Sequence, residues 1–191
     1  YTEKVAHEFL VMSPAEVSSW VEKSRAAFAA WKDVPVPERA KNFKRLAEVL
    51  RAEKRNYAGL ITGEMGKPIK ESLAEIEKCA WLSDYYAENA ARFLEPELIK
   101  TENAESYVAF EPLGVVLAIM PWNFPFWQAF RFGVPAIIAG NVVLLKHASN
   151  VPMTALAIED AFRAAGFPEG VFKTLLIGPK AAMKLIEEDK V

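Results

Sequence analysis

Asn123 is the residue whose surroundings most clearly favour chemistry. It follows an apolar run that ends at Met120, and Pro121 and Pro125 stand two residues to either side of it. Because proline fixes its own φ angle and disfavours the helical region for the residue before it, the backbone here has little freedom. An amide held in this way can donate a hydrogen bond to an oxyanion. An asparagine that only satisfies the backbone of a turn is the usual alternative, which this context disfavours.

Lys146 and Ser149 follow a second apolar run, residues 142–145, and are candidates for binding a nucleotide. Ligands of α/β proteins bind beyond the carboxyl ends of parallel strands, where a lysine can contact ribose hydroxyls or phosphate. A serine shortly before a helix that begins at Pro152 can donate to a phosphate near that helix N-terminus. The structural alternatives carry similar weight: a solvated lysine at the start of a loop, and a cap shared with Asn150.

Arg131 lies eight residues past Asn123, on a predicted helix. If that helix lines a cleft, the guanidinium can bind a substrate carboxylate through two parallel hydrogen bonds. A surface ion pair is the commoner role of an arginine, and the residue alone does not decide between the two.

Cys79 is the only cysteine of the chain. It lies beside the apolar seam of a predicted helix, which favours a small buried hydrophobic residue over a nucleophile. His7 and His147 are the only histidines, and these residues show no metal-ligand spacing, so we expect no metal site. The sequence has no Gly-x-Gly-x-x-Gly motif and no P-loop.

The elements that must position these residues begin with three predicted helices in the first 92 residues. Ser13 and Glu16 form a capping box with Pro14 at the first helical position. A second helix begins at residues 35–37, and Pro68 begins the third. The third has an apolar seam at helical spacing, made of Ile69, Leu73, Ile76, Ala80, Ser83, Ala87 and Ala90.

Strands that alternate with helices are predicted after residue 96. Residues 106–110 alternate like a half-exposed strand, and residues 115–120 are apolar throughout, like a strand covered on both faces. Two more strands are expected at 142–145 and 171–177. Helices are expected at 126–138, with Pro135 as a kink or early stop, from Pro152 to Gly166, and after Gly178. This order predicts an α/β fold with a parallel, doubly wound sheet.

Composition limits the classes of function. The 191 residues are 52% hydrophobic, carry a net charge of −2, and contain no signal-peptide pattern or apolar run long enough to span a bilayer. A near-neutral charge argues against nucleic acid or a membrane surface as a partner. One cysteine excludes an intrachain disulfide, and we expect a cytoplasmic protein. Three strands ending shortly before Val191 leave an open sheet edge, so the sequence reads as truncated.

The chain resembles the N-terminal part of an aldehyde dehydrogenase, most closely the succinate-semialdehyde branch. The order and spacing of six motifs carry this resemblance over nearly the whole chain. They are Gly63-Glu64-Met65-Gly66-Lys67-Pro68, Glu111-Pro112-Leu113-Gly114, Met120-Pro121-Trp122-Asn123-Phe124-Pro125, Ala139-Gly140-Asn141, Val143-Leu144-Leu145-Lys146 and Ala165-Gly166-Phe167-Pro168-Glu169-Gly170-Val171.

The resemblance implies an incomplete cofactor-binding domain: a Rossmann-like parallel sheet with an N-terminal helical layer. Residues 1–92 correspond to its helical part, 93–111 to an oligomerisation or bridging segment, and 112–191 to its truncated Rossmann-like part. The catalytic domain, with the nucleophilic cysteine and the general-base glutamate, is absent from this sequence. The resemblance also implies self-association into a homodimer or homotetramer.

The implied reaction is NAD(P)-dependent oxidation of an aldehyde, with succinic semialdehyde as the expected substrate. In the family a cysteine thiolate attacks the aldehyde, an asparagine matching Asn123 holds the oxyanion, hydride passes to the cofactor, and an activated water hydrolyses the thioester. The resemblance assigns Arg131 to the substrate carboxylate. It assigns Met120, Pro121, Trp122, Asn123, Lys146, Ser149 and Gly178 to the cofactor site.

Three positions depart from the family pattern. Ser149 stands where NAD-preferring members often carry a glutamate, which would repel a 2′-phosphate, so we favour NADP or dual use. His147 replaces the usual proline, so the loop need not have the family's stiffness. Ala182 occupies a position that is often glycine near the cofactor phosphates. The alternative function is a non-catalytic dinucleotide-binding or assembly module derived from the same fold.

Overall fold

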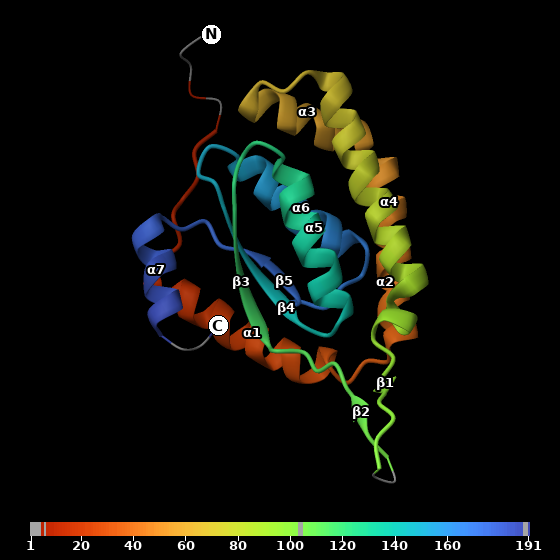
Figure 1. The fold of residues 1–191 in the computed structure, drawn as a ribbon. Coiled ribbons are helices and arrows are strands. Elements are labelled where there is room, and N and C mark those ends of the chain that lie inside the picture. The colour runs from red at the N-terminus through yellow and green to blue at the C-terminus, as the bar shows by residue number, and fades with distance from the viewer. Residues whose placement is uncertain (1–4, 6, 103–104, 189–190) are drawn as a thin grey trace.

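A parallel sheet lies at the centre of the molecule (Figure 1). The computed structural model describes residues 5, 7–102, 105–188 and 191. Strands β3 (Val115–Met120), β4 (Val142–His147) and β5 (Phe172–Thr174) lie in the order β3-β4-β5, with β4 central. The register pairs β3 with β4 along its whole length, and β4 with all three residues of β5. The predicted α/β class with a parallel sheet is confirmed.

Helices cover both faces of this sheet. Successive side chains of a strand point to opposite faces, so Leu144 and Leu145 of β4 enter different hydrophobic clusters. The smaller cluster joins the Leu144 face to α1 (Pro14–Trp31) and α7 (Pro179–Glu187). The larger cluster joins the Leu145 face to α5 (Pro125–Ile138) and α6 (Pro152–Ala164).

An outer layer of three helices packs over α5 and α6 (Figure 1). It consists of α2 (Val36–Ala52), α3 (Lys54–Met65) and α4 (Ile69–Phe93). The sequence pattern predicted only three helices in residues 1–92, but the described part of this region has four, because the chain turns at Glu53 between α2 and α3. No glycine or proline marks this turn. It directs α3 toward the N-terminus of α6, where Glu64 of α3 accepts hydrogen bonds from the backbone.

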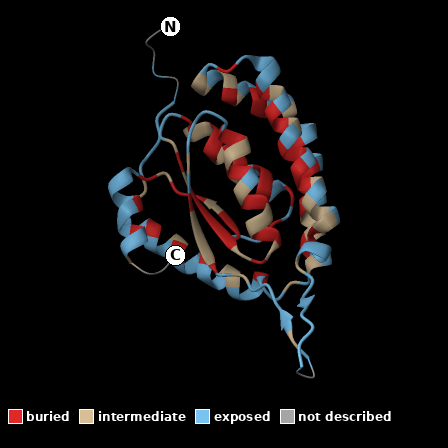
Figure 2. Ribbon diagram, in the orientation of Figure 1, coloured by how far each residue is buried: buried red, intermediate tan, exposed pale blue. Residues whose placement is uncertain are grey.

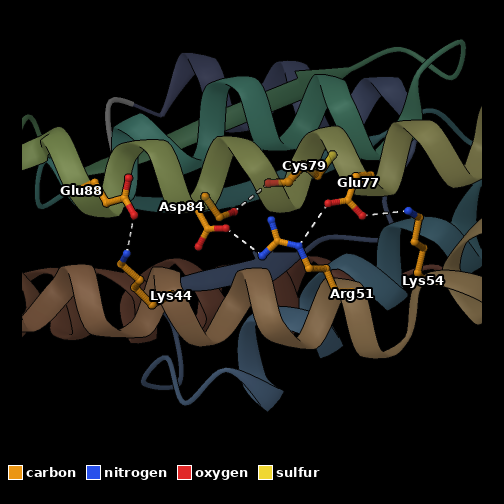
Figure 3. A network of polar contacts seen from close by, with 8 residues as sticks. Lys44, Arg51, Lys54, Glu77, Cys79, Asp84 and Glu88 are labelled. Carbon is orange, nitrogen blue, oxygen red and sulfur yellow. Dashed lines mark hydrogen bonds and ion pairs between the residues drawn. The ribbon is translucent and has the colours of Figure 1, made fainter.

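Charged side chains join the outer edges of α2 and α4 (Figure 3). Arg51 Nη1 lies 2.7 Å from Asp84 Oδ2, and Lys44 Nζ lies 2.6 Å from Glu88 Oε1. Beneath these exposed pairs, Cys79 is fully buried, as the sequence predicted. The predicted seam of α4 is only partly right: Ile69 is 49% exposed. The buried positions are Ser72, Glu75, Ile76, Cys79, Ala80, Leu82, Ser83 and Ala90.

The first helix begins as the sequence predicted. Ser13 Oγ accepts a hydrogen bond from Glu16 N at 3.3 Å, and the Glu16 carboxylate accepts one from Ser13 N at 2.7 Å. This reciprocal arrangement satisfies two backbone donors at the start of α1. The helix α5 continues past Pro135 for three residues, so this proline does not stop it early.

The strands differ in detail from the predicted ones. β3 is an edge strand and is only partly covered, since Ala118 is buried but Ile119 is 50% exposed. β4 continues to His147, and β5 is three residues long rather than seven. The remainder of the predicted third strand, up to Ile177, runs beside the N-terminal segment, where Met12 N donates to Leu176 O at 2.9 Å.

A two-stranded hairpin projects away from the body of the molecule (Figure 1). Strands β1 (Glu97–Leu98) and β2 (Tyr107–Val108) are antiparallel and two residues long, so the strand predicted at 106–110 is shorter than expected. Both are exposed (Figure 2), with Leu98 77% and Tyr107 57% accessible. Of the described helices, none is both long and apolar enough to cross a membrane.

Candidate functional site

The carboxyl ends of β3 and β4 lie side by side. The parallel register pairs Ile119 with Lys146 and Met120 with His147. The segment after β3 contains Asn123, and the segment after β4 contains Ser149. The two motifs that sequence analysis singled out therefore meet at one edge of the sheet, where ligands of parallel α/β proteins bind.

Asn123 lies in an exposed corner between β3 and α5. Phe124, the residue before α5, has φ −138° and ψ 73°, which lies outside the helical region that the following proline disfavours. The Asn123 side chain makes no hydrogen bond with any residue that the structure describes. The structural alternative was an asparagine whose side chain hydrogen-bonds the turn backbone, and no such bond exists in the described part of the chain.

The helix side of this corner is held by two residues of the outer layer. Glu75 Oε1 accepts a hydrogen bond from Trp127 N, in the first turn of α5, at 3.0 Å. Glu75 Oε2 accepts one from Lys67 Nζ, and this ammonium lies 3.7 Å from the centre of the Phe124 ring. Lys67 belongs to one of the motifs of the resemblance, whereas Glu75 was not predicted from the sequence. Its position beside Ile76 and Cys79, on the buried face of α4, was the available signal.

His147 holds the same corner from the strand side. Its Nδ1 accepts a hydrogen bond from Ala148 N at 2.8 Å, which assigns the ring proton to Nε2. Nε2 lies 3.0 Å from Pro125 O and donates to it. Histidine stands here in place of the family's usual proline, and both of its ring nitrogens bond to backbone groups. Burial lowers the pKa of His147, while the bond to Pro125 acts in the opposite direction.

Asn141 connects the other end of β3 to α5. Its Oδ1 accepts hydrogen bonds from Leu113 N at 2.7 Å and Gly114 N at 3.1 Å, while Nδ2 donates to Ala136 O at 3.0 Å. Sequence analysis noted Asn141 only within a motif. Its amide fixes the start of β3 relative to the end of α5. The position of the Asn123 corner, which follows β3, depends on this contact.

Two of the predicted cofactor residues, Ser149 and Gly178, line one cavity of about 280 Å³. The cavity lies beyond the carboxyl ends of β4 and β5, and its wall includes Leu175, Ile177 and the N-terminal segment 9–11. A Cβ atom at Gly178 would meet open space, so a larger residue would not clash there. The glycine leaves this part of the cavity wall open. Met120, Pro121, Trp122 and Asn123 are not part of this wall, but lie at the neighbouring strand end.

Lys146 lies inside β4 rather than after it, which corrects the predicted strand end. It pairs with Ile119 and points to the face that also carries Leu144. The lysine is half-buried and makes no hydrogen bond or ion pair with the described residues. Its ammonium is therefore available to a ligand at this edge.

The backbone N–H groups at the N-terminus of α6, near which Ser149 was predicted to bind a phosphate, are bound by a carboxylate. Glu64 of α3 accepts hydrogen bonds from Met153 N at 2.7 Å and Thr154 N at 2.8 Å. A carboxylate at this position satisfies the free backbone donors and repels a second anion. Ser149 must therefore act, if it contacts a nucleotide, through its own hydroxyl in the cavity.

The remaining candidates are separated from the cavity. Arg131 is exposed on α5 and forms no ion pair within the described ranges, so the surface-pair alternative is not realised there. Burial raises the pKa of the Cys79 thiol well above its usual value, which disfavours the thiolate that a nucleophile requires. Ala182 is buried against Leu185 in the cluster shared with α1.

A parallel sheet covered on both faces, with a cavity beyond its strand ends, defines a Rossmann-like α/β protein. The sequence profile described as "Aldehyde dehydrogenase family" matches residues 1–191. This chain belongs to the aldehyde dehydrogenase family, which confirms the resemblance found in its motifs.

The chain is similar to several succinate-semialdehyde dehydrogenases. It is 45% identical over 190 residues to a probable succinate-semialdehyde dehydrogenase [NADP(+)] of Synechocystis sp., covering 100% of this chain and 42% of that protein. It is 42% identical over 194 residues to a succinate-semialdehyde dehydrogenase [NADP(+)] of Mycobacterium avium, covering 100% of this chain and 41% of that protein.

A solved structure agrees with these sequences. The succinic semialdehyde dehydrogenase of Streptococcus pyogenes, in complex with NADP+, matches with a TM-score of 0.96 at 32% identity. The match covers 100% of this chain and 42% of that one. The chain thus spans less than half the length of the relatives that it matches.

Proposed function

We propose that this chain is the N-terminal part of a cofactor-binding domain, in an enzyme that oxidises succinic semialdehyde to succinate with NADP or NAD. Family membership supports the reaction class, and the relatives from Synechocystis sp. and Mycobacterium avium support the substrate and the cofactor. Because the chain spans 42% of the Synechocystis protein, we assign the activity to a longer polypeptide and expect the isolated 191 residues to be inactive.

The main support for the proposal is that the side-chain amide of Asn123 is unbonded, at a corner that neighbouring elements hold in place. Asn123 has no hydrogen-bond partner in the described ranges, while the residues after it are held by Glu75 and His147. A donor that is already oriented stabilises charge that develops in a transition state without a cost of reorganisation. We assign Asn123 to the oxyanion that forms when a cysteine thiolate attacks the aldehyde carbon.

The cavity beyond β4 and β5 fits a nucleotide. Its apolar wall and the Ser149 hydroxyl suit a ribose and base, and Lys146 supplies a cation at the adjoining edge. When bound, NADP or NAD accepts the hydride from the substrate. Ser149 is neutral and can donate a hydrogen bond, so a 2′-phosphate meets no repulsion at this position and NADP is favoured. Met120, Pro121, Trp122 and Gly178 complete the proposed cofactor site.

Arg131 is the proposed partner of the substrate carboxylate. It lies two turns along α5 from the Asn123 corner and has no competing anion among the described residues. A guanidinium recognises a carboxylate through two parallel hydrogen bonds. This arrangement favours a semialdehyde whose far end carries a carboxylate.

The nucleophilic cysteine and the glutamate that activates water for thioester hydrolysis are assigned to the longer polypeptide. Cys79 is excluded as the nucleophile by its complete burial. We also propose that the enzyme is a cytoplasmic homo-oligomer, that residues 93–111 bridge its subunits, and that residues 1–92 and 112–191 form the helical and Rossmann-like parts of one domain. A non-catalytic dinucleotide-binding or assembly module is the second candidate, and a gene that ends at Val191 would favour it.

The test is Asn123→Ala in the longer polypeptide, with Asn89→Ala on α4 as the matched control. The expected result is a loss of about 100- to 1000-fold in kcat for NADPH formation, with cofactor affinity unchanged. The control variant retains wild-type kcat, because the side-chain hydrogen bonds of Asn89 within the described ranges stay inside its own helix, with Tyr85 and Arg92. Undiminished hydride production by Asn123→Ala would contradict the proposal.

A further inference from the structure

The pair Lys67–Glu75 is the most deeply buried ion pair of the described residues. Its side chains are 5% and 2% exposed, whereas the pairs that join α2 and α3 to α4 (Figure 3) involve side chains that are 29% to 60% exposed. Removing two charges from water is costly, and a well-packed apolar pair is often as stable. Stability alone therefore does not explain why a charged pair occupies this buried position.

The contacts of the pair converge on the residues that follow Asn123. The two oxygens of Glu75 are divided between Lys67 Nζ and the backbone N–H of Trp127, 3.0 Å away. The Lys67 ammonium faces the ring of Phe124 at 3.7 Å. The pair thus holds Phe124, the residue after Asn123, and the first turn of α5, which follows Phe124.

The start of α5 depends on this contact. Phe124 precedes the helix and cannot cap it, and no side chain of the preceding segment does so. The Glu75 carboxylate binds a free N–H group there, and its charge is favourable at a helix N-terminus. The hydrogen bond from Lys67 orients the carboxylate in this buried setting.

We propose that Lys67 and Glu75 are positioning residues for Asn123. Glu75 fixes the first turn of α5 and Lys67 fixes Phe124, so that together they determine where the amide lies relative to the sheet edge. This inference rests on the proposed function, in which Asn123 is the oxyanion donor. In this role Lys67 and Glu75 act through Asn123 rather than directly on substrate or cofactor.

The experiment is Glu75→Ala in the longer polypeptide, alone and combined with Asn123→Ala. A displacement of the amide by about 1 Å can reduce turnover about 100-fold, so we expect kcat to fall about 10- to 100-fold. The KM for the aldehyde and the Kd for NADP remain unchanged. Because the pair acts through Asn123, adding Glu75→Ala to Asn123→Ala causes no further loss of kcat.

Glu159→Ala is the matched control. Glu159 has the same divided arrangement as Glu75: one oxygen accepts from Lys173 Nζ at 2.7 Å and the other from Thr174 N at 2.8 Å. It joins α6 to β5 without contacting the Asn123 corner. The control is expected to lower Tm while kcat remains that of the wild type, which separates positioning from general stability.

Three results would overturn the inference: a wild-type kcat for Glu75→Ala, an equal loss for Glu159→Ala, or a loss that multiplies with that of Asn123→Ala. If Glu75→Ala does not fold, Glu75→Gln replaces it in the same cycle, since glutamine keeps the acceptor for Trp127 N but loses the charge facing Lys67. Failure of the proposed function is recognised separately, because Asn123→Ala alone would then retain full kcat.

Discussion

Individual side chains at the sheet edge differ in how far their hydrogen-bonding groups are already used. Both hydrogen-bonding atoms of the His147, Glu75 and Glu64 side chains are engaged, and each side chain binds a backbone group of a neighbouring element. Asn123 and Arg131 have no partner among the described residues. The bonded side chains therefore hold the structure of the sheet edge, and the unbonded ones remain available to ligands.

Arg131→Ala tests substrate recognition at the scale of one residue. Loss of a bidentate partner is expected to raise KM for a carboxylated aldehyde, with little change for an uncharged aldehyde of similar length. The measurement is steady-state kinetics of the longer polypeptide with both substrates. Arg163→Ala, on the exposed side of α6, is the control and is expected to change neither KM. An equal change for both aldehydes would exclude Arg131 as a carboxylate clamp.

His147 predicts a pH-dependent stability. Its pKa is lowered in the folded protein, chiefly by burial, while Glu64 raises it and Lys146 lowers it. The unfolded chain therefore binds a proton first, and the contribution of His147 to stability is complete above about pH 6.5 and is lost as pH falls toward the lowered pKa. Protonation also removes the acceptor for Ala148 N–H.

The measurement is Tm between pH 7.5 and 5 for the wild type and His147→Phe. The variant is expected to be less stable at pH 7.5, because Pro125 O and Ala148 N lose their partner, and to show a smaller decrease on acidification. The control is His7→Gln, at an exposed position, which keeps the wild-type slope. An unchanged slope in His147→Phe would contradict this prediction.

At the scale of elements, the outer layer does more than cover α5 and α6. Helix α4 supplies Glu75 to the start of α5, and α3 supplies Glu64 to the start of α6. Both recipient helices begin with proline at the first position and lack a side-chain cap from the residue before them. Their free N–H groups are satisfied by carboxylates from elsewhere in the chain.

Glu64→Ala tests this capping between elements. Leaving Met153 N and Thr154 N without their charged acceptor is expected to reduce the free energy of unfolding by about 1–3 kcal/mol. Denaturant titration of the variant against wild type provides the measurement. Glu48→Ala, an exposed position of α2, is expected to stay within about 0.5 kcal/mol of wild type. Equal stabilities of the two variants would argue against a capping role.

At the scale of the whole molecule, apolar side chains remain exposed in the projecting hairpin. Leu98, Ile99, Tyr107, Val108 and Phe110 are between 45% and 77% accessible, and two short strands are not independently stable in water. An exposed apolar edge that can accept another strand favours contact with a second subunit. This is the physical basis for the proposed bridging role of residues 93–111.

Tyr107→Pro tests the bridging role in the longer polypeptide. Proline removes a backbone donor and restricts φ in β2, so the pairing with Leu98 is expected to be lost and the oligomer to dissociate into a smaller form. The measurement is mass by light scattering, with Lys100→Ala as a control that leaves the hairpin backbone intact. An oligomer of unchanged mass would contradict the role.

The sequence alone was sufficient for features encoded by neighbouring residues. Apolar runs placed β3 and β4, Pro152 and Gly178 marked the starts of α6 and α7, and the motif around Asn123 indicated the family. The turn at Glu53 escaped prediction because no local breaker marks it. The bonds from Glu75 to Trp127, 52 positions apart, and from His147 to Pro125, 22 positions apart, were decided by tertiary structure alone. Such contacts depend on how packed elements are aligned in space, and hydrophobic periodicity along the chain carries no record of that alignment.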